Sequence, residues 1–282
     1  MKEYKFTIFT PLYNGAKTIH RVVESLDNSL YRNFEWIVVN DGSNDNSISV
    51  LNKLIEDKNW EITIINHHEN QGKHNAWNEA ARIAKGEIFI NLDCDDAFIP
   101  ESLSFLNAKW NEHFGDRNIS GIDVLCVDAE TKELCGTEYP YDGIVSNYED
   151  FYSIYKIRGD KWNTFRTEYV RKFPFPNIKA NYYTECYLHY SLAELYKTVG
   201  YNEKLHLYYM ENASITHTKT EKINTIYMIM HYQRWHIPRV AFRLIRKNPR
   251  ELCRCIKEFV IMFVKYNIMN LFNVSEVKYN VK

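Results

Sequence analysis

The sequence predicts an α/β protein built around a mostly parallel sheet that is flanked by helices. The first hundred residues alternate between the two-residue period of strands and the longer period of helices. Strand and helix follow one another in a regular rhythm, which implies parallel strands joined by right-handed crossovers. A cluster of polar residues follows each predicted strand, and such sheets bind ligands outside the carboxyl ends of their strands.

The first two strand–helix units are clear in the sequence. Phe6–Thr10 is predicted as a strand, and Thr18–Leu30 as an amphipathic helix with its apolar residues on one face. Glu35–Asn40, "EWIVVN", is predicted as the second strand because it is rich in β-branched residues. Ser47–Lys58 is predicted as the second helix, with a cap region at Asn44–Asn46.

A third unit and a fourth strand complete this half. Glu61–Asn66 and Glu87–Leu92 are predicted as strands, and Asn75–Lys85 as the helix between them. Gly86 is expected to end that helix, because glycine commonly follows the last helical turn.

The remainder of the chain is less regular. Residues 102–209 give a mixed pattern, with a strand at "GIDVLCVDA" and a helix at Tyr182–Tyr196. Asn224–Phe272 is predicted as helices that form a C-terminal extension. We therefore expect one domain with halves at 1–100 and 101–220, followed by the helical extension at 221–282.

Composition restricts the class of protein. The 282 residues carry 35 Lys plus Arg against 36 Asp plus Glu, so a general role in binding nucleic acid is not indicated. The six cysteines lack CxxC spacing, which is typical of reduced cytosolic thiols. No apolar run approaches the roughly 20 residues of a membrane span, and no secretory signal is visible. We expect a cytoplasmic protein, at most peripheral on the inner face of the membrane.

An acidic stretch, "NLDCDD", follows the fourth predicted strand. Asp93 and Asp95 are two positions apart, a spacing that points both carboxylates to the same side of an extended chain. Two hard oxygen donors with open positions suit Mg²⁺ or Mn²⁺, which keeps waters and binds substrate phosphates. The alternative is a solvated acidic turn. The first interpretation is favoured because polar loops follow the other three strands as well.

Those other loops offer nucleotide-binding groups. Tyr13 and Asn14 follow the first strand, and the Tyr13 ring can stack on a base or pack internally. Asp41, after the second strand, can accept a hydrogen bond from a base, form a turn with Gly42, or do both. Lys73 precedes the third helix, where a lysine and helix amides attract phosphate.

Taken together, four motifs resemble a known family. "TPLYNG", "WIVVNDGSNDNS", "ENQGKHNAWNEA" and "LDCDDAFIP" are similar to the successive motifs of family 2 glycosyltransferases with the GT-A fold, a Rossmann-like sheet. The resemblance spans Phe6 to about Pro100, and it implies that residues 1–100 are the nucleotide-sugar-binding half of the domain and residues 101–220 the acceptor-binding half. It implies a nucleotide-sugar donor, usually UDP-linked, a divalent metal at an Asp-x-Asp motif, and inversion at the anomeric carbon.

The resemblance also assigns roles to individual positions. It places Pro11 and Tyr13 against the base and Asp41 on the uracil. It places Asp93 on the ribose or the metal, and Asp95 on the metal.

The family also needs a general base on the acceptor side. Glu185, in "NYYTECYLHY", is the candidate to remove the acceptor hydroxyl proton, although a glutamate at a helix start also stabilises the helix dipole. Three residues depart from the family pattern. Asn40 stands where many relatives have Asp, Trp77 replaces a frequent Arg, and Cys186 replaces a common second acid.

Further candidates lie in the second half of the chain. Lys161, Trp162 and Arg166 are similar to a stretch that could bind acceptor or diphosphate, with Trp162 as a sugar platform or as a core residue. His217 is a candidate metal ligand or a structural histidine. The basic, aromatic-rich tail could lie on anionic lipid, or pack on the domain.

We therefore expect an inverting transferase that moves a sugar from a UDP-sugar to a glycan or lipid-linked acceptor, in bacterial surface polysaccharide synthesis, with Mn²⁺ or Mg²⁺. A degenerate, non-catalytic subunit of the same fold is the alternative from a different class. A nucleotidyltransferase is less favoured, because the loop after the first strand is not the Gly-rich basic loop that such enzymes carry. A Rossmann dehydrogenase is disfavoured because no G-x-G-x-x-G follows that strand.

Overall fold

The computed structural model describes residues 4–177 and 183–209 and, towards the C-terminus, 234, 236–238, 241, 244–246 and 249–271. Nine strands form one sheet within these residues, in the order β3-β2-β1-β4-β8-β6-β9-β5, with β7 paired to β9. The strands are β1 (Tyr4–Leu12), β2 (Phe34–Asn40), β3 (Glu61–Asn66), β4 (Gly86–Asn91), β5 (Ala97–Phe98), β6 (Ile119–Asp128), β7 (Ile144–Ser146), β8 (Lys161–Arg166) and β9 (Lys197–Tyr208).

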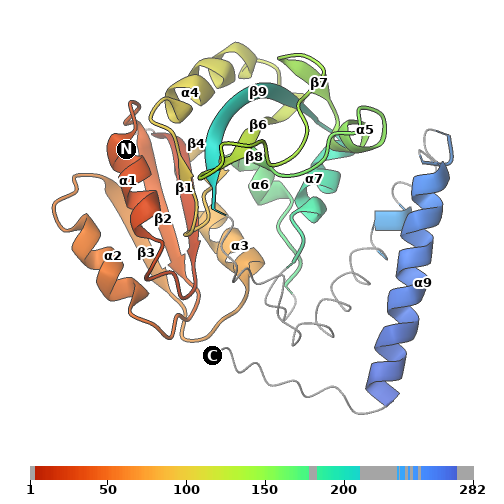
Figure 1. The fold of residues 1–282 in the computed structure, drawn as a ribbon, viewed down its shortest axis with the longest axis horizontal. Helices are drawn as coiled ribbons and strands as arrows, with labels where there is room; N and C mark the ends of the chain where they lie inside the picture. Colours follow the sequence, from red (N-terminus) through yellow and green to blue (C-terminus); the bar gives the residue numbers. More distant parts are fainter. Residues whose placement is uncertain are drawn as a thin grey trace.

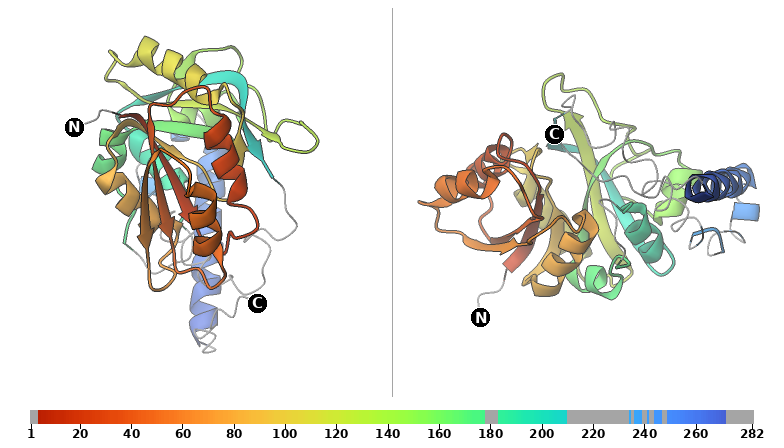
Figure 2. Two further views of the ribbon diagram at one scale, coloured as in Figure 1. Left: turned by 90° about the vertical axis from the view of Figure 1, so that its left-hand side faces the viewer. Right: turned by 90° about the horizontal axis from the view of Figure 1, so that it is seen from below.

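Helices lie on both faces of this sheet, and one further helix, α9, stands apart from it (Figures 1 and 2). The helices of the described residues are α1 (His20–Asn28), α2 (Ser47–Ile55), α3 (Lys73–Ile83), α4 (Ser102–His113), α5 (Tyr148–Ser153), α6 (Thr167–Lys172), α7 (Cys186–Ala193) and α9 (Pro249–Leu271). The predicted α/β fold with a helical C-terminal segment is confirmed.

The four N-terminal strands are parallel, as predicted. β1 pairs with β2 and β4, and β2 pairs with β3, all in parallel register. Beyond β4 the sheet is mixed, because β8 runs antiparallel to both β4 and β6, while β6 and β9 are parallel. One sheet therefore joins strands from the two predicted halves of the domain.

Two apolar layers hold the sheet between the helices. Alternate residues of a strand point to opposite faces. Phe6 and Ile8 of β1 pack on one side with residues of α1, α2 and α4, whereas Phe9 packs on the other side with residues of α3, α6 and α7. Burial on both faces explains why these strands are almost continuously apolar.

The predicted end of the third helix is wrong. α3 ends at Ile83, and Gly86 is instead the first residue of β4. A Cβ atom on Gly86 would lie 2.3 Å from the backbone nitrogen of Thr7, so glycine is needed here for the close approach of β4 to β1. The Gly86 amide also donates to the buried Glu35 carboxylate, at 3.1 Å.

Candidate functional site

The loops that follow β1 and β2 are tied together at the carboxyl edge of the sheet. The Asn14 amide donates to Ser43 Oγ at 3.0 Å, and the Asn44 amide donates to Asn14 Oδ1 at 2.8 Å. Asn14 has a positive φ of 52°, a left-handed conformation that asparagine tolerates better than most residues. The predicted rim residue Asn14 therefore links two of the loops.

Asp41 organises the next loop. It is 3% exposed, and its two carboxylate oxygens accept hydrogen bonds from the amides of Gln71 and Gly72, both at 2.8 Å. The turn itself is capped by Asn40, whose Oδ1 accepts from the Ser43 amide. The Asp41 carboxylate thus holds the segment that leads into α3, and its binding of uracil stays a prediction.

His67 completes this network, although the sequence did not identify this residue as part of the site. Its Nδ1 lies 2.8 Å from Asp41 Oδ1, and its Nε2 lies 2.7 Å from Glu79 Oε2. Burial opposes the charged form, but the bonds to Glu79 and Asp41 outweigh it and raise the pKa of His67. A protonated imidazole can donate to both carboxylates at once.

Lys73, the first residue of α3, connects the two halves of the domain. Its Nζ lies 2.7 Å from Asp93 Oδ1 and 2.7 Å from Glu185 Oε1. Burial opposes the charge, yet Asp93 and Glu185 hold the pKa of Lys73 well above its usual value. The structure therefore brings three predicted site residues, from separate segments, into direct contact.

The acidic stretch is a turn and not an extended segment. β4 ends at Asn91, and the Asp96 amide donates to the Asp93 carbonyl at 3.1 Å. The argument that alternation in an extended chain aligns Asp93 with Asp95 is therefore wrong. Asp93 is half-buried, with Oδ1 accepting from the Asn91 side chain at 3.0 Å, while Asp95 is exposed.

The three carboxylates of this turn differ in charge. Burial raises the pKa of Asp93, but Lys73 outweighs it and the pKa is lowered. Asp96 is buried, and that burial together with Asp93 and Asp95 raises its pKa to about 9. Asp96 is therefore neutral near pH 7, and mutual repulsion in the turn is reduced without a ligand.

Asp93 and Asp95 are the residues of this turn that would hold a magnesium or manganese ion. Among the described residues no group of three or more His, Cys, Asp or Glu side chains gathers as a metal site. Such a group is not required, because Mg²⁺ is commonly held by one or two carboxylates together with substrate phosphates and water. Asp93 and Asp95 supply two carboxylates beside a lysine. His217, the further candidate ligand, lies outside the described residues.

Glu185 lies directly before α7, as predicted for the candidate base. Its side chain is 37% exposed and makes no capping hydrogen bond to the helix. It also lines a cavity of about 210 Å³, formed mainly by β6, β8, α5 and α7. The Glu185 carboxylate therefore contacts Lys73 and is also accessible from this cavity.

Two candidates from the β8 segment are structural residues. Trp162 is 4% exposed, and its ring stacks on Phe98, so it is a core residue and not a sugar platform. Arg166 is 1% exposed and donates to backbone carbonyls, including that of Ile119 at 2.7 Å, so it does not reach a ligand. Lys161 does line the cavity beside Glu185.

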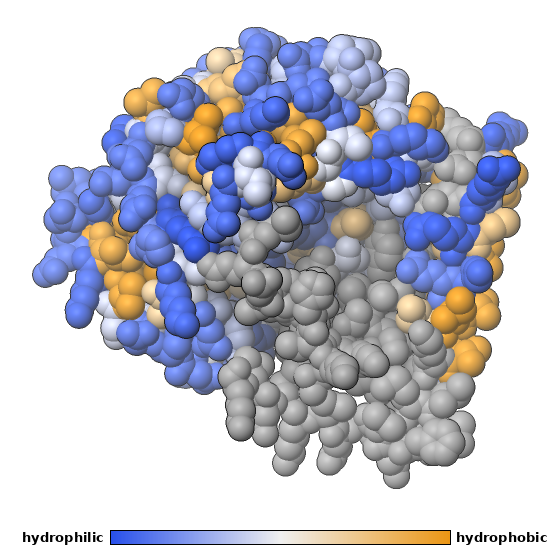
Figure 3. Space-filling model, in the orientation of Figure 1, coloured by the Kyte–Doolittle hydropathy of each residue, from blue (hydrophilic) through white to orange (hydrophobic). Residues whose placement is uncertain are grey.

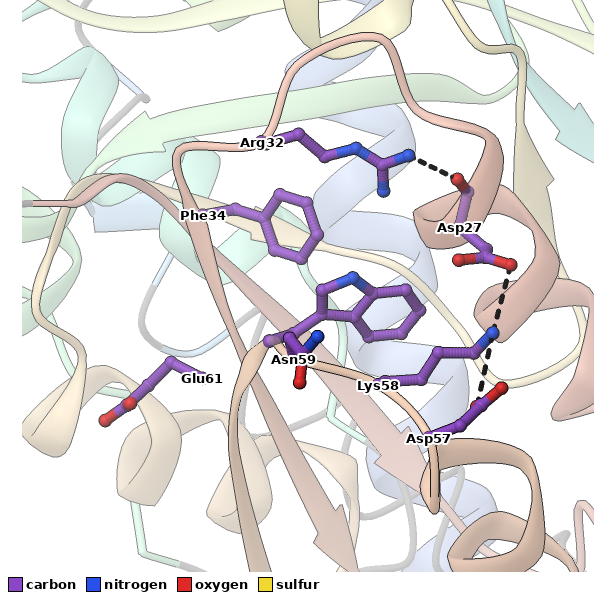
Figure 4. Close-up of a pocket in the computed structure, with 8 residues that line it drawn as sticks. Asp27, Arg32, Phe34, Asp57, Lys58, Asn59 and Glu61 are labelled. Carbon is purple, nitrogen blue, oxygen red and sulfur yellow. Dashed lines mark hydrogen bonds and ion pairs between the residues drawn. The ribbon is translucent and has the colours of Figure 1, made fainter.

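A larger cavity, of about 450 Å³, lies at the amino ends of β2 and β3 (Figure 4). Its charged groups already pair with the chain: Lys58 Nζ lies 3.0 Å from an Asp27 carboxylate oxygen, and Arg32 donates to the Asp27 carbonyl. It lies at the opposite edge from the polar loops. We therefore do not assign it to the candidate site.

The family pattern described as "Glycosyl transferase family 2" matches residues 7–124. Residues 7–124 are a glycosyltransferase family 2 domain. This segment contains the loops of Asp41, Lys73 and Asp93, and the predicted family is confirmed.

Curated relatives agree with the family 2 domain. An uncharacterized glycosyltransferase of Nostoc is 27% identical over 74% of this chain and 66% of its own length. The Campylobacter jejuni GalNAc(5)-diNAcBac-PP-undecaprenol beta-1,3-glucosyltransferase is 27% identical over 57% of this chain and 52% of its own length. The chain thus spans less than two thirds of either relative.

Solved structures show the same GT-A fold. Residues 1–349 of TarS from S. aureus, in complex with UDP-GlcNAc, give a TM-score of 0.64 with 16% identity over 97% of this chain and 76% of that chain. A mannosyltransferase of Pyrobaculum calidifontis, with GDP-Man and Mn²⁺, gives 0.58 with 17% identity over 99% of this chain and 81% of that chain. Within the part of this chain that is described, no helix is both long and apolar enough to cross a bilayer.

Proposed function

We propose that this chain transfers a sugar from a nucleotide-sugar donor to a hydroxyl group of a glycan or lipid-linked acceptor, with inversion at the anomeric carbon. The observation that carries the proposal is the contact of one ammonium, Lys73, with both Asp93 and Glu185. A candidate donor-binding carboxylate and a candidate base thus flank the same cation. A transferase needs this proximity, because the two substrates must meet at one carbon.

The relatives support the choice of substrates. UDP-GlcNAc is bound by the TarS structure, which favours a UDP-sugar donor here. The Campylobacter relative is named for a glycan on undecaprenol diphosphate, which favours a lipid-linked acceptor and a role in bacterial surface polysaccharide synthesis.

The proposed reaction is a single displacement. The acceptor oxygen forms a bond to the anomeric carbon while the bond from that carbon to the diphosphate oxygen breaks. The bonding electron pair leaves with the nucleoside diphosphate, and Glu185 takes the acceptor proton as general base. Lys73 offsets the negative charge that develops on the leaving diphosphate.

Asp93 and Asp95 would hold the divalent metal, which would neutralise part of the charge of the diphosphate. Asp41, through the Gly72 amide, fixes the start of α3 and hence the position of Lys73. Pro11, Tyr13 and Asn14 line the rim on which we place the base.

The test is release of nucleoside diphosphate from a panel of UDP-sugars and GDP-mannose, with glycan and lipid-linked acceptors. We expect turnover that requires Mn²⁺ or Mg²⁺, a product of inverted anomeric configuration by NMR, and loss of turnover in Asp95→Asn. Full turnover in excess chelator would count against the proposal.

A non-catalytic subunit is the second candidate, and Cys186 favours it. The thiol stands where a second acid is common, and its Sγ lies 3.8 Å from the Tyr148 hydroxyl. Binding of UDP without transfer to any acceptor in the panel would support this candidate.

Peripheral membrane contact through α9 is part of the proposal. Apolar side chains gather along this helix at the right-hand edge of Figure 3, and Val260 and Phe263 are each about half exposed. Arg254 and Lys257 are exposed on the same helix. Sedimentation with anionic vesicles, but not with neutral vesicles, is expected; equal recovery with both would contradict an electrostatic contact.

A further inference from the structure

The cavity of about 210 Å³ beside Glu185 is lined by elements of the second half of the domain. Asp123 comes from β6 and Lys161 from β8. Tyr148 and Tyr152 come from α5, which packs beside α7 (Figure 1). Because Glu185 lines the cavity and also touches Lys73, the cavity adjoins the candidate donor site.

Asp123 is the unusual group in this cavity. It is 2% exposed, and its Oδ1 has no hydrogen-bond partner among the described residues. Its Oδ2 accepts one hydrogen bond, from the Tyr139 hydroxyl, and at 3.4 Å this bond is long. A buried polar atom without a partner is rare in native proteins, and such atoms often have a functional reason.

Burial of Asp123 also has an electrostatic consequence. Desolvation raises the pKa of its carboxyl to about 7, although Asn163, Lys161 and Tyr139 lower it. The chain therefore keeps a destabilising acid in the middle of a strand that is buried along its whole length. A ligand hydroxyl that donates to Asp123 would remove part of this cost.

The charge of the cavity restricts the ligand. Asp123, Asp160 and Glu185 line it together with Lys161, and because Glu185 is already paired with Lys73, two acids remain against the one lining ammonium. Lys161 Nζ already donates to the Arg158 carbonyl at 3.0 Å. An excess of acids repels phosphate and carboxylate ligands, and it favours groups that donate hydrogen bonds.

The walls and the size of the cavity restrict the ligand further. Aromatic rings form much of its lining, from Tyr139, Tyr148, Phe151 and Tyr152. Such rings contact the apolar face of a pyranose while polar groups at the edge take its hydroxyls. The cavity volume lies below the ~300 Å³ at which pockets for drug-sized ligands begin, so it suits a single ring.

We propose that this cavity binds the terminal sugar of the acceptor, that this sugar is an uncharged pyranose, and that Asp123 accepts a hydrogen bond from one of its hydroxyls. The inference rests on the proposed function, because it takes Glu185 as the base. Asp123 is then a specificity residue, and it excludes anionic acceptors such as uronic acids and polyol phosphates.

The test is saturation-transfer NMR with methyl glycosides of neutral hexoses and N-acetylhexosamines, methyl glucuronide and glycerol 3-phosphate. Asp123→Leu removes the polar group at similar size, and it should fold, because an apolar side chain suits a buried strand. Asp123→Asn is the second variant. Asp57→Asn, an exposed acid at the opposite edge of the sheet, is the matched control.

We expect at least one neutral glycoside to bind the wild type and Asp57→Asn, and to bind Asp123→Leu at least tenfold more weakly, with Asp123→Asn between them. The anionic probes should bind more weakly than that glycoside. Equal binding to Asp123→Leu, tighter binding of an anion, or no binding of any neutral glycoside would overturn the inference.

Titration of UDP into the same samples separates this inference from the proposed function. If UDP binds but no neutral glycoside does, the cavity assignment fails and the donor site stands. If a glycoside binds but UDP does not, the proposed function fails, and the cavity is a sugar site of another kind.

Discussion

Lys73 Nζ lies 2.7 Å from Glu185 Oε1, although the two residues are more than a hundred positions apart in the chain. The same ammonium lies 2.7 Å from Asp93 Oδ1. One cation therefore couples the candidate donor side of the site to the candidate base. A diphosphate that attracted Lys73 would compete with Glu185 for it, and this competition makes Lys73 the most informative residue to change.

Replacing Lys73 with methionine should reduce kcat/KM by roughly 10²-fold, because the ammonium that we propose to stabilise the leaving group is lost, and with it the ion pairs to Asp93 and Glu185. Affinity for UDP should also fall. Lys73→Arg should restore part of the activity. Lys85→Met, which removes an exposed lysine paired with Glu61, is the control. Steady-state kinetics with unchanged values for Lys73→Met would contradict this role.

Glu185→Gln should lower kcat by about 10²- to 10⁴-fold, the range that general base catalysis contributes. UDP affinity should be retained, because the amide keeps the shape of the side chain. Glu194→Gln, at the other end of α7, is the control for a general effect of removing a glutamate from that helix. A Glu185→Gln variant that turns over at the wild-type rate would assign the base elsewhere.

His67 should make stability depend on pH. Its pKa is raised in the folded state, so the stabilisation from its charged form is fully present below the unfolded pKa of about 6.5. It is lost as the pH rises through the folded pKa. We expect the melting temperature of the wild type to fall in this interval relative to that of His67→Asn.

The exposed neighbour His68, changed to Asn, provides the control for the His67 experiment. The melting temperature of His68→Asn should follow the wild type across the same pH range. Parallel curves for the wild type and His67→Asn would show that the contacts to Asp41 and Glu79 contribute nothing that depends on charge.

Asp123 should also make stability fall as the pH rises, because its buried carboxyl becomes charged. Its folded pKa, about 7, is above the ordinary value of 3.8, so the folded state binds the proton more tightly. Stability therefore falls as the pH rises from about 4 to 7, and stays low above this interval. Asp123→Leu should melt at least ~3 °C above the wild type at pH 8, and the gain should shrink at pH 5. Differential scanning calorimetry at pH 5 and pH 8, with Asp57→Asn as control, measures this difference in melting temperature.

The parallel half of the fold could be predicted from sequence because its strands are buried on both faces, which leaves uninterrupted apolar runs. β3 was placed at its observed bounds, Glu61–Asn66. Helix ends were less accurate, since α3 starts at Lys73, two residues before the predicted start. Gly86 was assigned to a helix end because a sequence does not reveal that two strands approach too closely for a Cβ atom.

Site residues that directly follow a predicted strand could be predicted from the sequence. Residues whose role depends on whether the fold buries their side chains could not. Trp162 and Arg166 have side chains that suit ligands, but the packing of β8 places both in the core. The contacts of His67 with Asp41 and Glu79 could not be predicted, because the sequence does not show which loops meet. Asp123 had a signal, an acid inside "GIDVLCVDA", which is unusual in a buried strand.

The most direct test of the account is calorimetric titration of UDP into the protein with and without Mn²⁺, repeated with Asp95→Asn and Lys73→Met. The account predicts binding that requires Mn²⁺, that is lost in Asp95→Asn and that is weakened in Lys73→Met. Binding of UDP that is equal in all three proteins, or equal with and without Mn²⁺, would contradict the assignment of Asp93, Asp95 and Lys73 to the donor site.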